Sequence, residues 1–279
     1  MSEDTTKPTE RSLSDPSQSG DELADQVSDT LGTASDQTAD AATTMDQVPA
    51  QTAQDVVLEE ERVKDEIEIQ IDLLKDPDWA VRREAVITLG EMGDERCVEP
   101  LVRSLRDGDW QVREAAVEAL GMVGSPSVDL LVRQLRDWNI RKYAIRALGK
   151  IKDERVLVPL LAQLRSDEFK EDATEALVEL GQPALEQLLT ALNDKDENVR
   201  KQAVIALGRI KDAAAVDALI GKLQDKDWYI RLTASAALET IGDERGREAI
   251  KPLLQDPDLV VKMRAERILA AWKKRTATA

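Results

Sequence analysis

The sequence repeats itself about every 30 residues, and this period constrains the fold more than any other feature. Seven basic residues are each followed three positions later by an alanine and seven positions later by a leucine. The basic residues are Arg82, Arg113, Arg141, Lys170, Arg200, Arg231 and Lys262. The alanines are Ala85, Ala116, Ala144, Ala173, Ala203, Ala234 and Ala265, and the leucines are Leu89, Leu120, Leu148, Leu177, Leu207, Leu238 and Leu269. Self-similarity at such a period is typical of stacked repeats, so we predict one elongated repeat domain.

Each repeat has the pattern of two consecutive helices. In the first complete repeat, apolar residues over 81–92 have the spacing of one helical face. Asp78 is suited to cap the start of this helix, and Gly93 is suited to the left-handed residue that ends it. Pro100 must lie in the first turn of the next helix, because an interior proline removes a hydrogen bond and clashes with the preceding turn. The second helix is therefore predicted to begin near Cys97 or Val98.

Small residues at fixed positions indicate close contact between neighbouring helices. An alanine methyl group allows two helices to approach, whereas a larger side chain there would overpack the core. Gly90, Gly121, Gly149 and Gly208 each follow one of the repeated leucines and extend this pattern. An aspartate also stands six residues before five of the basic positions, at Asp76, Asp107, Asp194, Asp225 and Asp256. These acids and bases are expected to form a ladder that fixes repeat geometry, although a charged binding strip is the alternative.

The repeats resemble a known family. The segment DPDWAVRREAVITLGEMGDERCVEPLVRSL at residues 76–105 is similar to HEAT repeats of the phycobilisome-lyase (PBS lyase) type, and residues 225–254 match nearly as well. The resemblance covers about residues 67–272, with a shortened segment between helices before the third and fourth repeats. It implies an all-α fold, a right-handed α-solenoid of stacked antiparallel helix pairs. Residues 76–279 would hold six helix pairs and a final capping helix, and residues 56–75 an N-terminal cap helix.

The start of the chain differs in composition. Residues 1–66 carry 17 acidic and 4 basic residues, a net charge of −13, which leaves −4 for the rest. Residues 1–55 are poor in apolar side chains and are expected to form a disordered acidic tail. The nearly balanced remainder has no basic run, so nucleic-acid binding is not expected. A single cysteine, no signal-peptide pattern and no long apolar stretch predict a cytoplasmic protein without a membrane span.

Most aromatic side chains fall on positions that vary between repeats. Trp79, Trp110, Trp138 and Trp228 each lie three residues before a basic position. Designed binders of this repeat type vary similar positions to build a concave binding face. By resemblance, that face would include Trp79, Arg83, Trp110, Glu114, Trp138, Lys142, Tyr143, Arg146, Trp228, Tyr229 and Leu232. The alternative is that each Trp covers the start of its own helix and packs on the next repeat.

The fourth repeat is acidic and has no Trp. Glu168, Glu171 and Glu175 have a spacing that would place them on one helical face. Three carboxylates there could dock a basic partner or a cation, or simply form a solvated acidic face. We include them among the candidate partner-binding residues and expect no metal site.

The residue types argue against most enzyme classes. The chain has no histidine, which excludes Ser-His-Asp and Cys-His nucleophile systems. It also excludes the iron-binding His-Glu pairs of deoxyhypusine hydroxylase, an enzyme of the family that these repeats resemble. No catalytic residue or cofactor is expected. The sequence favours a scaffold or adaptor that binds a protein partner through its concave face. The alternative is an E/F-type phycobilin lyase-like subunit, in which Arg83, Lys142 or Arg146 would contact the propionates of a bilin.

Overall fold

The computed structural model describes residues 64–278, and the expected acidic tail over 1–55 lies outside them. Within 64–278 the chain forms 14 α-helices, α2 to α15, with six short 3₁₀ segments and no strand. The all-α solenoid prediction is confirmed. In this part of the chain no single helix is long and apolar enough to cross a membrane, and one bent pair, Trp110–Val123 with Ser125–Gln134, meets the length and composition limits.

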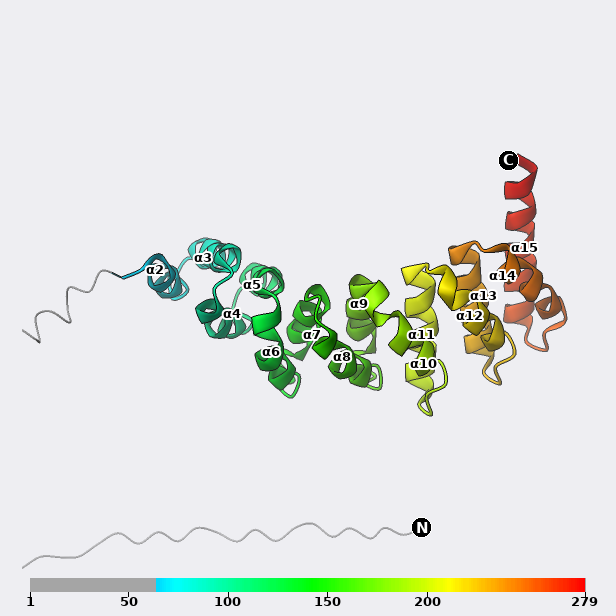
Figure 1. Cartoon of the computed structure of the whole chain (residues 1–279), viewed down its shortest axis with the longest axis horizontal. Coiled ribbons are helices and arrows are strands. Elements are labelled where there is room, and N and C mark those ends of the chain that lie inside the picture. Colours follow the sequence, from blue (N-terminus) through cyan, green and yellow to red (C-terminus); the bar gives the residue numbers. More distant parts are fainter. Residues whose placement is uncertain (1–63, 279) are drawn as a thin grey trace, which may run out of the picture. The chain divides into compact units, whose positions relative to one another are not determined.

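The helices alternate between two rows (Figure 1). After α2 (Glu66–Leu73), the first helices of the pairs are α3 (Trp79–Met92), α5 (Trp110–Val123), α7 (Arg141–Lys150), α9 (Lys170–Leu180), α11 (Glu197–Ile210) and α13 (Trp228–Ile241). The second helices are α4 (Val98–Ser104), α6 (Val128–Gln134), α8 (Leu157–Gln163), α10 (Leu185–Ala191), α12 (Val216–Lys222) and α14 (Glu244–Ile250). The last helix, α15 (Leu259–Thr278), continues the row of first helices.

Local signals set the helix ends as expected. The Asp78 carboxylate accepts a hydrogen bond of 2.9 Å from the backbone N–H of Ala80 at the start of α3. Gly93 ends that helix with a φ of 64°, a conformation that favours glycine. A 3₁₀ turn at Glu95–Cys97 then leads into α4, which begins at Val98. The prediction that Pro100 lies in the first turn of the second helix is confirmed.

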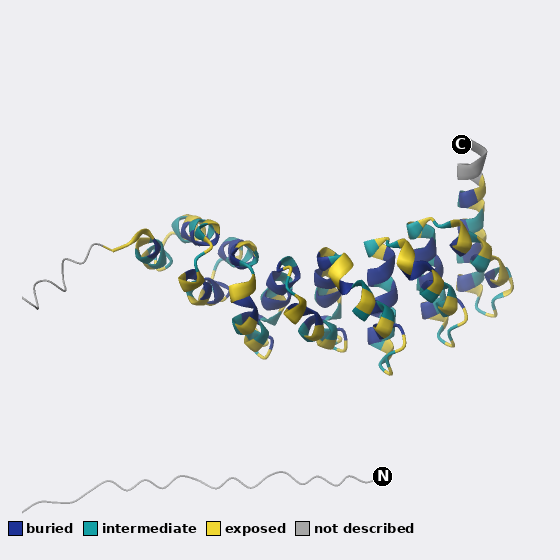
Figure 2. Cartoon of the chain, viewed as in Figure 1, coloured by how far each residue is buried: buried dark blue, intermediate teal, exposed yellow. Residues whose placement is uncertain are grey.

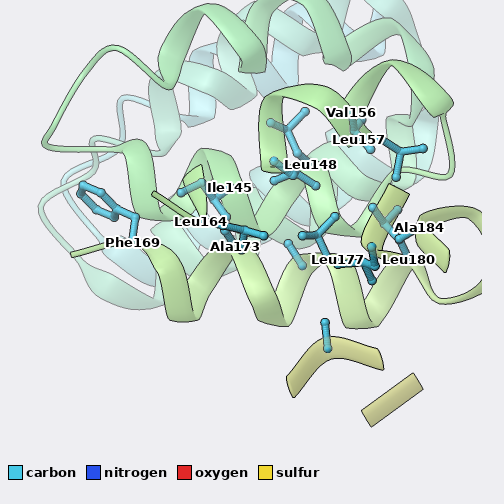
Figure 3. Packing of buried hydrophobic residues seen from close by; sticks show 14 of the residues in the cluster. Ile145, Leu148, Val156, Leu157, Leu164, Phe169, Ala173, Leu177, Leu180 and Ala184 are labelled. Carbon is cyan, nitrogen blue, oxygen red and sulfur yellow. The ribbon is translucent and has the colours of Figure 1, made fainter. Parts of the chain in front are cut away.

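The core lies between the two rows of helices (Figure 2). All seven alanines of the repeat pattern are at most 1% exposed, and six of the seven leucines are fully buried, the exception being the partly buried Leu269. Figure 3 shows Leu148 of α7, Leu157 of α8 and Leu177 of α9 among the side chains that fill this interior. Each repeat therefore buries its apolar face against its own second helix and its neighbours.

First helices of adjacent repeats approach each other closely at the predicted glycines. A Cβ atom on Gly149 would lie 2.6 Å from the Cα of Ala176 in α9, and one on Gly90 would lie 2.7 Å from the Cα of Ala119 in α5. Second helices such as α4 and α6 contact each other less extensively. Because the more closely packed layer of a curved stack lies on its inner side, we interpret the row of first helices as the concave one.

The third and fourth repeats have shorter first helices than the others. Helices α7 and α9 have 10 and 11 residues, whereas α3, α5, α11 and α13 each have 14. Their N-cap residues, Ile140 and Phe169, carry no side chain that can cap the helix. The shortened segment seen in the sequence therefore replaces an aspartate-capped start with an apolar one.

Candidate functional site

Large exposed hydrophobic side chains concentrate on the row of first helices. In the described part of the chain there are 11 such side chains, and nine belong to first helices, to α15 or to the turn before α7. The nine are Trp79, Trp110, Met122, Trp138, Trp228, Tyr229, Leu259, Val260 and Met263. We call the solvent-facing side of α3, α5, α7, α9, α11, α13 and α15 the first-helix face.

A first hollow on this face lies between α3 and α5. It has a volume of about 410 Å³, and its lining includes Arg83, Ile87, Trp110, Glu114 and Met122. The Trp110 side chain is 62% exposed, so most of its ring is available to a partner. We call this hollow the Trp110 groove. It brings three of the predicted site residues, Arg83, Trp110 and Glu114, to one place.

A second hollow lies at the other end of the face, between α13 and α15. It has a volume of about 520 Å³ and is lined by Tyr229, Leu232, Thr233, Ala236, Val260, Met263, Arg264 and Arg267. We call it the Tyr229 groove. Two predicted site residues, Tyr229 and Leu232, lie here. Trp228 makes an edge-to-face contact with the Tyr229 ring, with a centroid distance of 5.8 Å.

The centre of the first-helix face is charged and internally paired. Arg146 donates two hydrogen bonds of 2.6 Å to the Glu114 carboxylate, and these bonds lower the pKa of Glu114. The Lys142 ammonium lies 3.8 Å from the Asp172 carboxylate. Burial nevertheless raises the pKa of Asp172 above its usual value. Because these charged side chains already have partners within the protein, the centre has fewer free groups for binding a ligand than the two grooves have.

Two of the repeated arginines, Arg82 and Arg231, form ion pairs with an aspartate of the next repeat. Arg82 forms two hydrogen bonds of 2.8 Å to the Asp107 carboxylate of the next repeat, and Arg231 bonds Asp256 in the same way. The Arg82 guanidinium also donates to the carbonyl of Asp76, at 2.8 Å. The ladder therefore has the geometry of a structural linkage.

Aromatic side chains replace the aspartate where the ladder is interrupted. In the third repeat the position six residues before the basic residue Arg141 is Leu135 instead of an aspartate. Arg113 therefore donates a hydrogen bond of 2.9 Å to the Tyr143 hydroxyl instead. The Arg141 guanidinium carbon lies 5.6 Å from the Trp138 ring centroid and 5.0 Å from that of Phe169. The Trp138 and Phe169 rings meet edge to face at 4.9 Å. Trp138 and Tyr143 therefore make contacts between neighbouring repeats.

Comparison with known sequences decides the family. The family model described as HEAT repeats matches residues 67–137 and 183–270, more than half of the chain, and the PBS lyase HEAT-like repeat matches residues 140–166. The chain belongs to the HEAT-repeat family. The PBS lyase type predicted from the sequence is also confirmed. No curated protein matches this HEAT-repeat protein.

Comparison with solved structures finds several that are similar to this HEAT-repeat protein at low sequence identity. An engineered protein is 24% identical, with 76% of this chain and 98% of that chain covered and a TM-score of 0.33. Human deoxyhypusine hydroxylase is 21% identical, with 78% and 88% covered and a TM-score of 0.37. The CpcE–CpcF complex of phycocyanin lyase from Nostoc sp. PCC7120 is 20% identical, with 82% and 99% covered and a TM-score of 0.37.

The acidic residues of the fourth repeat do not share one helical face in this HEAT-repeat protein. Helix α9 begins at Lys170, so Glu168 lies in the turn before it, whereas Glu171 and Glu175 lie within the helix. The spacing was misleading because the shortened segment delays the start of α9. The Arg209 guanidinium pairs with the Glu175 carboxylate at 2.7 Å and lowers the pKa of Glu175. Among residues 64–278 no group of acidic or cysteine side chains has the arrangement of a metal site.

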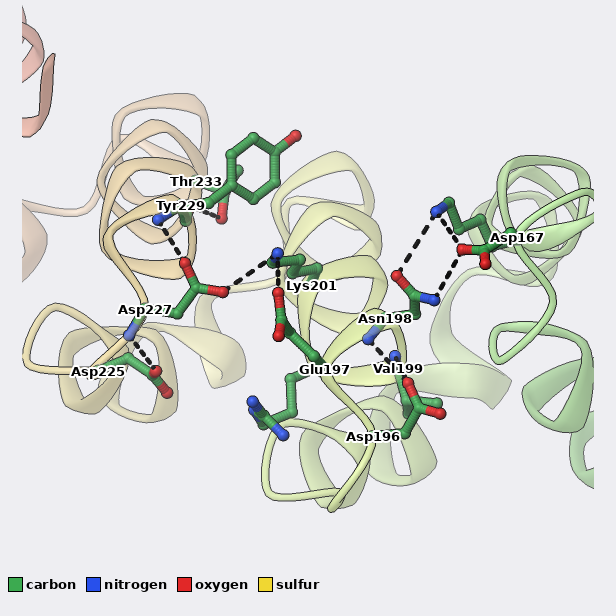
Figure 4. Close-up of polar contacts among 12 residues, drawn as sticks. Asp167, Asp196, Glu197, Asn198, Val199, Lys201, Asp225, Asp227, Tyr229 and Thr233 are labelled. Atoms are coloured by element: carbon green, nitrogen blue, oxygen red, sulfur yellow. Dashed lines mark hydrogen bonds and ion pairs between the residues drawn. The ribbon is translucent and has the colours of Figure 1, made fainter. Parts of the chain in front are cut away.

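Polar contacts hold the Tyr229 side of the face in place (Figure 4). The Lys201 ammonium lies 3.1 Å from the Asp227 carboxylate, also pairs with Glu197, and sits 5.2 Å from the Tyr229 ring centroid. Asp227 accepts a hydrogen bond of 2.8 Å from the backbone N–H of Tyr229. The ring is therefore held between repeats while 36% of the residue stays exposed.

Sequence reasoning missed several residues of the two grooves. Ile87 and Met122 line the Trp110 groove, and Val260 and Met263 line the Tyr229 groove. The repeat register contained the signal for the last two. Val260 and Met263 stand two before and one after Lys262, as Tyr229 and Leu232 stand relative to Arg231. Of the remaining predicted residues, Trp79 is exposed at the start of α3 and lines neither groove.

Proposed function

We propose that this HEAT-repeat protein is a scaffold that binds a protein partner on the first-helix face. The observation that carries the proposal is the unequal distribution of the 11 exposed large apolar side chains. Nine lie on this face or at its edge, and the other two are Ile69 on α2 and Val158 on the second helix α8. Exposed Trp, Tyr and Met side chains gathered on one face are typical of protein-binding surfaces. The two grooves provide pockets for anchor side chains, which dominate binding energy.

The last helix supports this interpretation. Six first helices bury the residue four positions after the basic residue, at Val86, Val117, Ile145, Thr174, Val204 and Ser235. In α15 the same position is Glu266, which is exposed. A charged residue there closes the stack, as terminal repeats require. Yet α15 keeps Leu259, Val260 and Met263 exposed on the first-helix face. These apolar side chains are therefore not explained by further stacking.

The bilin alternative has less support. The propionate groups of a bilin would need unpaired cations on the first-helix face. Arg146, however, pairs with Glu114, and Lys142 lies beside Asp172. Within residues 64–278 only Arg83 of the three candidate cations has no ion pair. Incubating the purified chain with a linear tetrapyrrole and recording its visible absorption tests this alternative. A stoichiometric spectral shift would favour a bilin over a protein ligand.

Site-specific photo-crosslinking tests the scaffold proposal. A photoreactive phenylalanine analogue replaces Trp110 in one variant and Val158 in a matched one, because both positions are well exposed but lie on opposite rows. After irradiation in a lysate of the source organism, the variant at residue 110 should form one or a few discrete adducts that mass spectrometry can identify. Equal adducts from both positions, or none from position 110, would contradict binding on the first-helix face.

A further inference from the structure

The two grooves of the first-helix face differ in charge. The Trp110 groove is lined by one arginine and two glutamates, Arg83, Glu114 and Glu118. The Tyr229 groove is lined by Arg264 and Arg267 and by no acidic residue. Residues 67–279 have a net charge of −4, so the two arginines make this groove a local positive patch on a nearly balanced repeat domain. A cationic apolar hollow can select a partner by charge.

The two arginines of the Tyr229 groove have different surroundings. The Arg264 guanidinium donates a hydrogen bond of 3.0 Å to the Glu239 carboxylate, while its Nε–H is buried without a partner among the described residues. Arg267, one helical turn further along α15, is exposed, and no carboxylate of residues 64–278 pairs with it. Arg264 is therefore held in place, and Arg267 has its hydrogen-bond donors available.

The apolar part of the same groove has room for a large side chain. The Tyr229 ring, held by Lys201, forms one wall, and Val260 and Met263 of α15 form the other. Met263 is an unbranched and adaptable side chain that suits a contact surface. Val260 and Met263 are both more than half exposed, so a ligand would cover apolar area that water now contacts.

We infer that the Tyr229 groove binds an acidic peptide segment of a partner protein, in which a large apolar side chain is followed or preceded by a carboxylate. The apolar side chain packs between Tyr229 and Met263, and the carboxylate accepts hydrogen bonds from Arg267. Arginine suits this role because its planar fork can donate two bonds to one carboxylate. The inference rests on the proposed function and names the chemistry of the partner at one end of the face.

Peptide display on the full chain tests this inference. Random linear peptides are selected against the wild-type protein, and the enriched peptides are then measured by fluorescence anisotropy. We expect enriched sequences to combine Leu, Phe or Trp with Asp or Glu, and to lose affinity as salt is raised. Arg267→Glu should weaken these peptides by about tenfold or more and turn the selection toward Lys- and Arg-containing peptides. Met263→Ala, made in either background, should weaken the binding of both the acidic and the basic peptides, because it removes part of the apolar contact.

Matched variants separate this inference from the proposed function. Arg133→Glu changes an exposed arginine on α6, in the other row, and should leave binding unchanged. Enriched peptides that are basic or uncharged, that ignore Arg267→Glu, or that fail to appear at all would overturn the inference. Peptides that bind only through the Trp110 groove, and are lost on Trp110→Ala, would overturn it while leaving the scaffold proposal standing. Thermal melts of each variant confirm that the fold is retained.

Discussion

The guanidinium of Arg82 and the carboxylate of Asp107 join two consecutive repeats through a two-point ion pair. The Nε–Oδ2 and Nη2–Oδ1 distances are both 2.8 Å. Both side chains are mostly shielded from water, with exposures of 16% and 13%. Arg82 also donates to the carbonyl of Asp76 in its own repeat. A single side chain therefore fixes both its own turn and the position of the next repeat.

This pair predicts a dependence of stability on pH. The hydrogen bonds from Arg82 lower the pKa of Asp107 below its usual value. In the unfolded chain an Asp carboxyl titrates near pH 3.9, so the contribution is complete above about pH 4 and is lost as the pH falls further. Asp107→Asn should lower the free energy of unfolding at pH 7 by about 1–3 kcal/mol.

Urea unfolding at pH 7 and pH 3 provides the measurement. The difference between wild type and Asp107→Asn should shrink at the lower pH. Asp129→Asn is the control, since its pair with Arg155 at 3.3 Å is largely exposed and is expected to contribute less than about 1 kcal/mol. An equal loss in both variants would show that the linkage between repeats is not special.

Two glycines should respond to alanine in opposite directions. A Cβ on Gly149 would lie 2.6 Å from the Cα and Cβ of Ala176, and only a shift of α9 could relieve that contact. We expect Gly149→Ala to cost about 1–3 kcal/mol. Gly221 lies in α12 with nothing within 4 Å, so Gly221→Ala should stabilise the protein by about 0.5–1 kcal/mol. Thermal denaturation followed by circular dichroism tests both, and a stable Gly149→Ala would refute close packing of the first helices.

Two similarly exposed tryptophans should differ in their effect on stability. Trp138 and Trp110 are 58% and 62% exposed, but Trp138 contacts Phe169 and Arg141. Trp138→Ala removes these aromatic and cation–π contacts and should cost about 1–2 kcal/mol. Trp110→Ala should change unfolding by less than about 0.5 kcal/mol, because it lines an open groove. Chemical denaturation of the two variants checks this order, and the reverse order would assign Trp110 to packing.

Removing the charge of Glu266 at the end of the stack should make the protein self-associate. Glu266 holds the position that earlier first helices bury. Glu266→Leu would leave an apolar surface able to stack on a second copy, so sedimentation velocity should detect concentration-dependent association. Glu248→Leu, at an exposed site on α14, is the control and should stay as associated as wild type. Identical sedimentation of both variants would mean that Glu266 does not close the stack.

The sequence predicted the residues that build the fold better than those that build the site. The alanine register and the glycines after the leucines marked buried and closely packed positions. Of the predicted site residues, Arg83, Trp110 and Glu114 line one groove, and Tyr229 and Leu232 line the other. The prediction that Glu168 shares a helical face with Glu171 and Glu175 was wrong, because it assumed that α9 begins as early in its repeat as the other first helices do.

Signals within one repeat determined the helices of this protein, whereas the tertiary structure decided which side chains meet. Asp78, Gly93 and Pro100 act through hydrogen bonds and sterics within a few residues, so their roles follow from order along the chain. Tyr143 replaces a missing aspartate for Arg113, a partner 30 residues away, and this pairing depends on how the shortened third repeat stacks. Contacts between repeats depend on how neighbouring helices are placed relative to each other, and the sequence pattern within one repeat does not determine that placement.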